Sequence, residues 1–370
     1  MTRKKKIMIP VFSILGAVII AFSAVLITAA VMGKRLKVSP SRSLEGVGEE
    51  IQDILWYSSI SANSHNSQAW TVKLYPDENK LQITVDDKRT LAVVDATKRE
   101  AYISLGCYIE TMNTAFMAYG YETQMICNEN TVELTYSKVQ PIVNKDKLNL
   151  IDKRHTDKSA YSTKQLNSTT VNDFLAKYNG LHIYQNGEKD FAYLKRATID
   201  AVTLQSADQN YRNELAEWLR FSDQEASEKL DGITAEMIGL KGIVKTFYYW
   251  TTSHESAKGD KFAKQGIDTA EKQVNNCGAF AIIMGGNTFA ELIDTGRVTQ
   301  AFWFDCAEHD IAVQPLSAAL ETQPFSDEIQ RDLGVTAPVQ MILRLGYVND
   351  YGSNLGLRRN LADYIEVIRG

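Results

Sequence analysis

The sequence predicts an α+β fold, and two observations support this class. Segments rich in β-branched and aromatic residues predict strands bounded by turns, at 70–75, 81–85, 122–127, 131–136, 279–284 and 339–345. Longer segments with helical apolar spacing separate them, at 44–55, 99–118, 188–206, 210–221 and 297–311. Strand pairs and helices occur in both halves without regular βαβ alternation, which favours α+β over a doubly wound α/β fold.

The order of these elements divides the chain of 370 residues into two units. We assign residues 44–149 to the first unit and residues 150–370 to the second. Their related content predicts an internal pseudo-duplication. Residues 222–275 look irregular except for an aromatic helical patch at 247–250, and we interpret them as a lid insertion over a binding site. Aromatic stripes of this kind also occur simply as packing.

The N-terminal region differs in composition from the rest. A basic segment, residues 1–6, precedes residues 7–32, which contain no charged side chain. This run exceeds the ~20 residues that span a bilayer, whereas a cleaved signal peptide has an apolar core of only ~7–15 residues. We therefore predict a retained transmembrane signal anchor over 7–32 and a polar linker over 33–43. The compact basic cluster at the start favours a single-pass protein of the cell membrane with its globular part outside the cytoplasm.

The charge and the cysteines exclude several functions. The net charge is −5, and no zinc-finger or RNA-recognition pattern is present, so we expect no nucleic-acid partner. The four cysteines are far apart and form no C-x-x-C motif. Residues 305–310 place Asp305 and His309 on one helical face, but two ligands make a poor metal site, and we expect no metal.

Two polar clusters are candidates for ligand binding. Within 61–70, the side chains of Ser64, Asn66 and Gln68 alternate, so in an extended segment they share one face. Amide groups on that face could bind the edge of a planar heterocycle such as a flavin, although a Ser/Asn-rich turn is the alternative. The second cluster, residues 153–158, combines basic side chains with a hydroxyl group. It is suited to phosphate binding but could also be a solvated loop.

These motifs resemble those of the FMN-dependent nitroreductase family. Residues 64–70 are similar to its Asn/Gln segment that ends in Trp, residues 154–158 to its phosphate loop, and Arg358-Arg359 to its C-terminal basic pair. Here the Asn/Gln segment precedes the phosphate loop. This order resembles the Acg-type branch, in which one chain mimics the family's dimer and holds a single FMN. The resemblance therefore implies a nitroreductase-like α-β-α sandwich and a monomeric globular part.

The resemblance also implies a set of FMN contacts. These would be Ser64, Asn66, Gln68, Arg154, Thr156, Lys158, Pro315, Leu316, Ser317, Arg358 and Arg359. No protein catalytic residue is expected, because flavin N5 carries the chemistry. Two departures from the family pattern weaken the preorganisation of the site: Ala69 replaces a proline, and Lys158 replaces an arginine.

Three functions remain open at this stage. The first is an oxidoreductase that uses NAD(P)H to reduce a small nitroaromatic or quinone-type acceptor through FMN. The second is an FMN-sequestering or storage protein whose lid prevents most catalysis. The third is a degenerate domain that has lost FMN and mediates contacts at the membrane.

Overall fold

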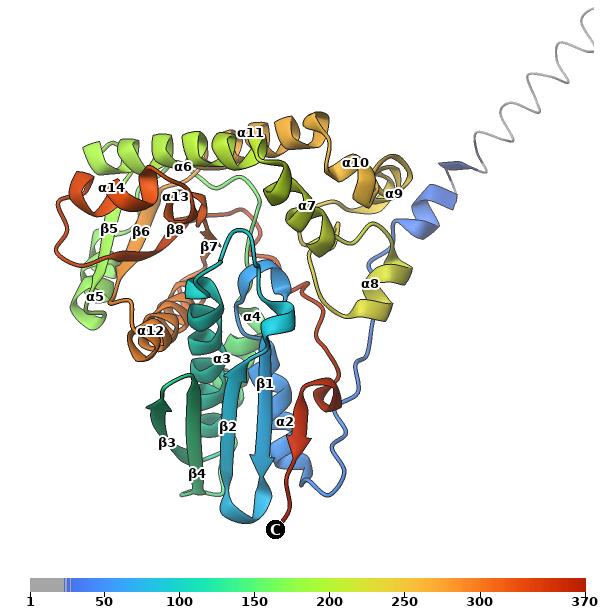
Figure 1. The fold of residues 1–370 in the computed structure, drawn as a ribbon, viewed down its shortest axis with the longest axis vertical. Coiled ribbons are helices and arrows are strands. Elements are labelled where there is room, and N and C mark those ends of the chain that lie inside the picture. Colours follow the sequence, from blue (N-terminus) through green and yellow to red (C-terminus); the bar gives the residue numbers. More distant parts are fainter. Residues whose placement is uncertain (1–22, 24, 27) are drawn as a thin grey trace, which may run out of the picture.

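The computed structural model describes residues 23, 25, 26 and 28–370 (Figure 1). Most of the predicted anchor over 7–32 lies outside these residues, and residues 28–32, at its end, are helical. None of the helices searched in the described part of the chain has the length and apolar character needed to cross a bilayer. The anchor therefore stays a prediction.

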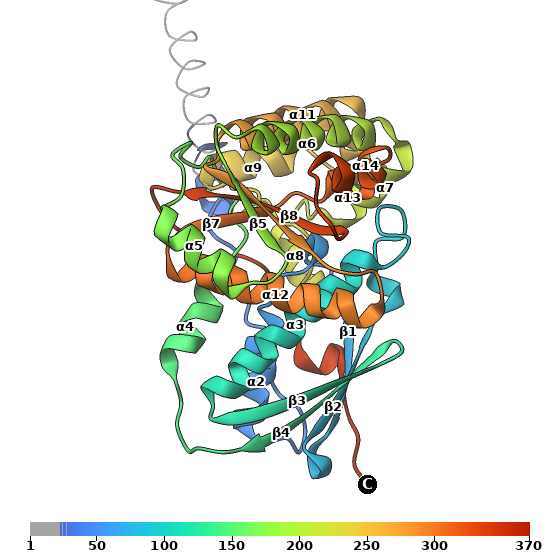
Figure 2. The same cartoon turned by 90° about the vertical axis from the view of Figure 1, so that its left-hand side faces the viewer.

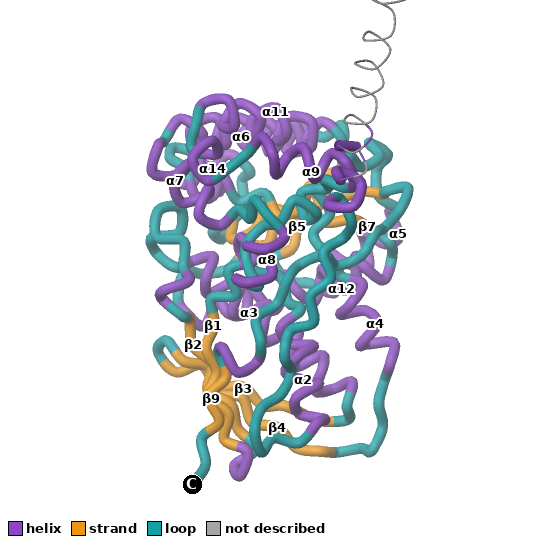
Figure 3. Tube along the Cα trace, turned by 90° about the vertical axis from the view of Figure 1, so that its right-hand side faces the viewer, coloured by secondary structure: helices purple, strands orange, loops and turns teal. Residues whose placement is uncertain are grey.

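The first sheet has five strands in the order β3-β4-β2-β1-β9. Their bounds are β1 Trp70–Tyr75, β2 Lys80–Val85, β3 Tyr121–Asn128, β4 Thr131–Lys138 and β9 Ile365–Val367. Strands β1 to β4 are joined antiparallel, whereas β9 runs parallel to β1. Figure 3 shows β9 among the strands of this sheet, near the C-terminus. The end of the chain therefore returns to the first sheet.

Helices cover the inner face of this sheet. They are α2 (Glu49–Ser59), α3 (Arg99–Ala118) and α4 (Lys145–Lys153). Side chains of α2 and α3 share one apolar core with alternate residues of the strands, such as Val72, Leu81 and Leu134. Three short 3₁₀ turns complete this region, namely η1 (Ser64–Asn66), η2 (Pro76–Glu78) and η3 (Asp87–Arg89).

The second sheet has four antiparallel strands in the order β5-β6-β8-β7. The strands are β5 Leu181–Gln185, β6 Ala279–Met284, β7 Ile311–Pro315 and β8 Val339–Tyr347. Both faces are covered, because along β6 Ala281 and Ile283 pack in one apolar cluster, and Phe280 and Ile282 in another. Helices α5 (Ser168–Lys177) and α12 (Phe289–Glu308) cover one face, and α6 (Lys189–Ala207) and α11 (Asp260–Asn275) the other (Figure 2). The predicted α-β-α sandwich describes this sheet.

Helices α3 and α12 join the two sheets. A Cβ atom added at Gly106 would lie 2.1 Å from the Ile293 carbonyl oxygen and 2.8 Å from the Gly296 Cα. The helices can approach this closely only because both positions are glycine. Gly106 is thus the point at which α3 packs most closely against α12. Gly296 lies inside α12 rather than before it, because α12 begins at Phe289 with Thr288 as a capping box.

The predicted lid region is mostly helical, so the expectation of an irregular segment over 222–275 is wrong. It contains α8 (Asp223–Lys229), α9 (Gly242–Thr251), α10 (His254–Ala257) and α11, and it follows α7 (Gln209–Trp218). The short helices α8 and α10, capped by Ser222 and Ser253, lack a long apolar period, which is why the sequence pattern did not show them. This reason does not apply to α11, which has 16 residues. The remaining elements are α13 (Ala318–Glu321), α14 (Phe325–Asp332) and η4 (Leu361–Asp363).

Candidate functional site

A cavity of about 1560 Å³ lies between the two units and the lid region. Small-molecule sites typically measure roughly 300–1,000 Å³, so this one has room for a cofactor and a second reactant. Its walls come from distant parts of the chain, namely residues 61–66, 100–107, 154–160, 233–241, 314–318 and 348–358, and from α6, α7 and α11.

Residues 64–68 form a tight turn and not the extended segment that the alternation of side chains requires. Residues 64–66 are a 3₁₀ turn, and His65, Asn66 and Gln68 have φ angles of 49°, 54° and 52°. The left-handed region is uncommon for side chains other than Gly and Asn, and three such residues in five positions need support from neighbouring structure. The expected common face of Ser64, Asn66 and Gln68 is therefore absent.

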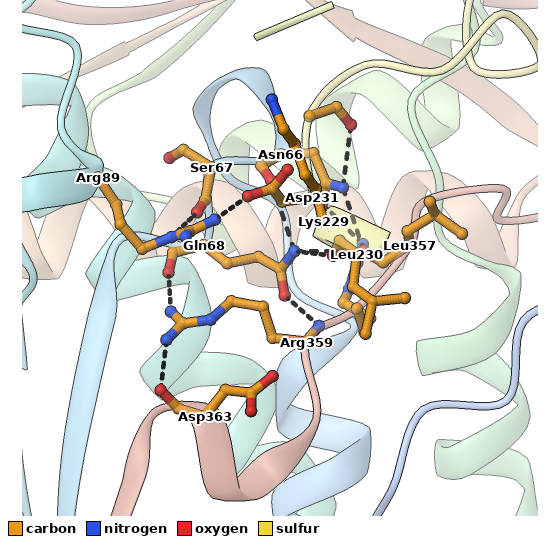
Figure 4. A network of polar contacts seen from close by, with 12 residues as sticks. Asn66, Ser67, Gln68, Arg89, Lys229, Leu230, Asp231, Leu357, Arg359 and Asp363 are labelled. Atoms are coloured by element: carbon orange, nitrogen blue, oxygen red, sulfur yellow. Dashed lines mark hydrogen bonds and ion pairs between the residues drawn. The ribbon is translucent and has the colours of Figure 1, made fainter. Parts of the chain in front are cut away.

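Gln68 provides much of that support (Figure 4). Its side chain is fully buried. Its Nε2 donates to the Leu230 carbonyl at 2.9 Å, and its Oε1 accepts the Arg359 backbone N–H at 2.9 Å. Gln68 does not line the cavity. The Gln68 side chain thus joins the turn to the lid region and to the C-terminal segment. Its predicted contact with a flavin remains untested.

Asn66 has a similar arrangement but reaches the cavity wall. Its Nδ2 donates to the carbonyls of Gly232 and Leu357, each at 3.1 Å, and its Oδ1 accepts Arg358 Nη1 at 2.8 Å. Both ends of the amide are therefore occupied by protein groups. The Asn66 side chain therefore fixes the position of the Arg358 guanidinium group.

Arg359 lies away from the cavity, in contrast to its neighbour Arg358. It donates to the carbonyls of Gln68 at 3.0 Å and Asp363 at 2.8 Å, and it lies over the ring of Tyr364. These contacts tie η4 and the end of the chain to β1. The predicted basic pair is thus divided, with one member in the cavity wall and one in the supporting structure.

Arg154 and Arg358 are buried guanidinium groups in the cavity wall. Arg154 donates to the Ile60 carbonyl and lies over the Trp303 ring, and Arg358 donates to the carbonyls of Leu357 and Ser61. Within the described part of the chain neither has a carboxylate partner, and the Nε of each has no acceptor. Burial lowers the pKa of Arg154 to about 10 and that of Arg358, which Arg154 also repels, to about 9. The wall therefore holds positive charge that an anion would stabilise.

The predicted phosphate loop lies on the same wall. Thr156 forms a parallel β-bridge with Val313, and this bridge aligns residues 154–158 with the middle of β7. Lys158 lines the cavity, and burial lowers its pKa. The structure thus brings Arg154, Thr156, Lys158 and Arg358 to one cavity, together with Ser64 and the predicted segment Pro315, Leu316 and Ser317.

An acid pair that the sequence analysis missed lies in the same wall. The carboxyl groups of Glu100 and Glu321 are hydrogen bonded to each other, Ser64 Oγ donates to Glu100, and Gln205 Nε2 donates to Glu321 at 2.7 Å. Burial and the Glu100 charge raise the pKa of Glu321 well above its usual range. Burial alone would raise the pKa of Glu100, but bonds from Glu321 and the charge of Arg99 lower it. Of the two carboxyl groups, Glu321 is thus the one that binds a proton more readily.

Glu100 carried a sequence signal, because it is an acidic residue at the start of a mostly apolar helix. Glu321 carried none, since it belongs to the four-residue helix α13. Asp305, from the weak metal cluster, instead accepts hydrogen bonds from Lys177 and Tyr178. No group of three potential metal ligands occurs among the residues that the structure describes.

No family model matches the sequence. Among curated proteins, the chain is similar to the probable NAD(P)H nitroreductase PigM of a Serratia species, with 23% identity over 197 residues. The match covers 49% of this chain and 54% of that protein, so the chain spans about half the length of this relative. The similarity to nitroreductases that the motifs indicate is thus found again in a curated relative, at low identity.

Two solved structures are also similar. The FMN-dependent nitroreductase NfnB from Mycobacterium smegmatis in complex with NADPH has 15% identity and a TM-score of 0.37, over 60% of this chain and 97% of that one. A nitroreductase-like family protein from Bacillus cereus has 13% identity and a TM-score of 0.33, over 60% of this chain and 95% of that one.

Proposed function

We propose that this chain is a membrane-anchored, FMN-binding oxidoreductase of the nitroreductase type, with its globular part outside the cytoplasm. The observation that carries the proposal is the pair of buried guanidinium groups of Arg154 and Arg358, which line the cavity without a carboxylate partner. Burying a charge without a partner is costly, and a phosphate group would supply the missing acceptor oxygens. The similarity to a probable NAD(P)H nitroreductase supports the same conclusion.

The positively charged residues of the cavity wall are suited to bind the phosphate end of FMN. Arg154, Arg358 and Lys158, with the Thr156 hydroxyl, would hold the phosphate. When bound, FMN supplies the acceptance and donation of hydride between NAD(P)H and a second substrate. The chain itself orients Arg358 through Asn66 and holds a proton on Glu321. That proton is available to a nitro or quinone oxygen as it is reduced.

One observation favours a second candidate, an FMN-sequestering protein. Residues 233–241 of the lid region form part of the cavity wall, and Glu236 within them is held by buried Lys245 at 3.0 Å. A wall held this firmly could exclude a nicotinamide from the cofactor. In that case FMN would be retained and little catalysis would follow.

The test is purification of the full chain in detergent, followed by visible absorbance. We expect a flavin spectrum for the wild type and its loss in the double variant Arg154→Ala, Arg358→Ala. Each charged hydrogen bond contributes about 1.5–3 kcal/mol, so the affinity should fall by about 10²–10⁴-fold. Exposed Arg331→Ala is the matched control and should keep the flavin. Full occupancy in the double variant would overturn the phosphate site.

Anaerobic addition of NADPH to the flavin-loaded wild type then separates the two candidates. Bleaching of the flavin supports the oxidoreductase. Persistent colour supports the sequestering protein.

A further inference from the structure

Helix α9 exposes its apolar side chains and buries its polar ones. The exposed fractions are 39% for Ile243, 59% for Val244, 45% for Phe247 and 45% for Trp250. Ile243, Phe247 and Trp250 follow the i, i+4, i+7 spacing of one helical stripe. A surface helix of a soluble protein turns such a stripe toward the core, so α9 has the opposite arrangement.

Buried charges fix α9 in this orientation. Lys245 is fully buried, and its Nζ donates to Asp223 at 2.8 Å, to Glu236 at 3.0 Å and to the Lys34 carbonyl at 3.0 Å. On the same side of the helix, Tyr249 donates to Asp223 at 3.0 Å. Rotating the apolar stripe inward would break these ion pairs and leave the buried Glu236 carboxylate without a cation. The exposed stripe is therefore built into the fold.

The end of the uncharged N-terminal run packs against α9. Gly242 N–H donates to the Gly33 carbonyl at 3.1 Å, and Thr246 Oγ1 donates to the Ala29 carbonyl at 2.7 Å. Figure 1 shows the segment that ends at Gly33 beside α9. Near this contact Val31 and Met32 are also exposed, at 56% and 44%. The exposed apolar side chains of α9 therefore adjoin the point at which residues 7–32 reach the globular part.

We propose that α9 lies in the interfacial region of a lipid bilayer, next to the N-terminal anchor, with its apolar stripe in contact with the lipid. This rests on the anchor in the proposed function. Helices that lie in a membrane interface present Trp, Phe and aliphatic side chains to the lipid and basic groups to the headgroups. Lys34, Arg35, Lys37 and Lys241 are exposed at the ends of the contact and supply such basic groups.

This placement has a consequence for the cavity. The segment that precedes α9, residues 233–241, forms part of the cavity wall, and Gly33 and Arg35 line the same cavity. The lid region therefore lies beside the lipid. An electron acceptor that partitions into the bilayer is the substrate class with the shortest path to this wall.

The test uses Trp250 as a probe in the full chain, reconstituted in phosphatidylcholine/phosphatidylglycerol vesicles with and without brominated acyl chains. The run 7–32 contains no tryptophan, so the anchor contributes nothing to the signal. We expect brominated lipid to quench the wild type, and Trp250→Phe to lose that quenching. Adding Phe247→Trp to the Trp250→Phe variant should restore the quenching, because residue 247 lies on the same apolar stripe of α9. Trp56→Phe, on α2, is the matched control and should quench as the wild type does.

The outcomes are distinguishable from failure of the FMN proposal, because flavin absorbance is measured on the same samples. Loss of quenching in Trp250→Phe supports the lipid contact whether or not flavin is bound. Equal quenching in wild type and Trp250→Phe, in vesicles that carry the chain on flotation, overturns it. Failure of the chain to float with the vesicles overturns both the anchor and the contact. A disulfide between two copies of a Val244→Cys variant, with no bromine effect, overturns it in favour of a second copy.

Discussion

Two sets of buried cations, one in the lid region and one in the cavity wall, differ in their partners. In the lid region, Lys245 pairs with Asp223 and Glu236, and Arg220, just before that region, pairs with Asp231 through Nε at 3.1 Å. In the cavity wall, Arg154 and Arg358 contact carbonyl oxygens, an amide oxygen and an aromatic ring. Both sets are at most a few per cent exposed.

The difference distinguishes structural cations from cations available to a ligand. A buried ion pair satisfies its own charge, and breaking it leaves the other member uncompensated. A buried cation without a carboxylate loses its hydration, and hydrogen bonds to neutral groups compensate this loss only in part. Binding of an anion would therefore stabilise it. Burial alone therefore does not indicate function, whereas burial without a counter-charge in a cavity does.

The largest effect should come from removing a paired cation. Lys245→Met should lower the free energy of unfolding by about 3–5 kcal/mol, because Glu236 stays buried without a cation and the partly exposed Asp223 loses its partner as well. Chemical denaturation of the full chain in detergent measures this value. The exposed neighbour provides the control, since Lys241→Met should change the stability by no more than about 0.5 kcal/mol. A loss below about 1 kcal/mol for Lys245→Met would remove the distinction between the two sets.

A smaller effect is expected from removing an unpaired cation. In flavin-free protein, Arg154→Met should stay within about 1.5 kcal/mol of the wild type, because no carboxylate is left behind and a volume-matched apolar side chain replaces the charge. Arg220→Met removes one of the two cations that pair with Asp231 and leaves only Arg89, so it should cost about 1.5–3 kcal/mol.

Added FMN extends this comparison. At 100 times its Kd, FMN should stabilise the wild type by about 2.7 kcal/mol, and it should stabilise Arg154→Met far less. Thermal unfolding with and without FMN measures both parts. If Arg154→Met and Arg220→Met lost the same free energy of unfolding in the absence of flavin, the distinction between paired and unpaired buried cations would be contradicted.

The last effect concerns pH at His65, a histidine of the cavity wall. Burial lowers the pKa of His65 to about 4 from an ordinary value of 6.5, although Glu100 opposes the shift. Between these values the unfolded chain binds more protons than the folded one, so stability rises as the pH increases from 4 to 6.5. His65→Asn, which tolerates the positive φ, should remove this contribution.

Melting curves of flavin-free protein at pH 4.5, 5.5 and 7 check the histidine prediction. The difference between wild type and His65→Asn should grow from pH 4.5 to pH 7. Each unit of pKa difference between the folded and unfolded states corresponds to about 1.4 kcal/mol of stability, so the change with pH is large enough to be measured by thermal unfolding. Parallel curves would show that His65 titrates as it does in water.

Local patterns predicted the regular elements well. The helix over 99–118 and the strands at 70–75 and 279–284 occur with the expected bounds. Their apolar residues recur at the period of one secondary structure, and that period is a property of a short segment. The short strands β5, β7 and β9 were missed, because their position depends on partners far away in the chain.

The candidate site was predicted in part. Arg154, Lys158 and Arg358 reach one cavity, whereas Gln68 and Arg359 support it from behind. All five belong to polar or basic clusters of similar appearance in the sequence. Gln68 lies away from the cavity in a turn with positive φ angles at 65, 66 and 68, which no alternation of residue types indicates.

The sequence by itself determined the main helices and strands, the uncharged run at 7–32 and the presence of phosphate-type basic clusters, because each depends on neighbours along the chain. The tertiary structure alone decided which of the buried cations have a counter-charge. It also placed Glu100 against Glu321 across 221 positions of the chain, and it turned the apolar face of α9 outward. These outcomes depend on long-range contacts, since burial and pairing are properties of the packed chain and not of any segment in it.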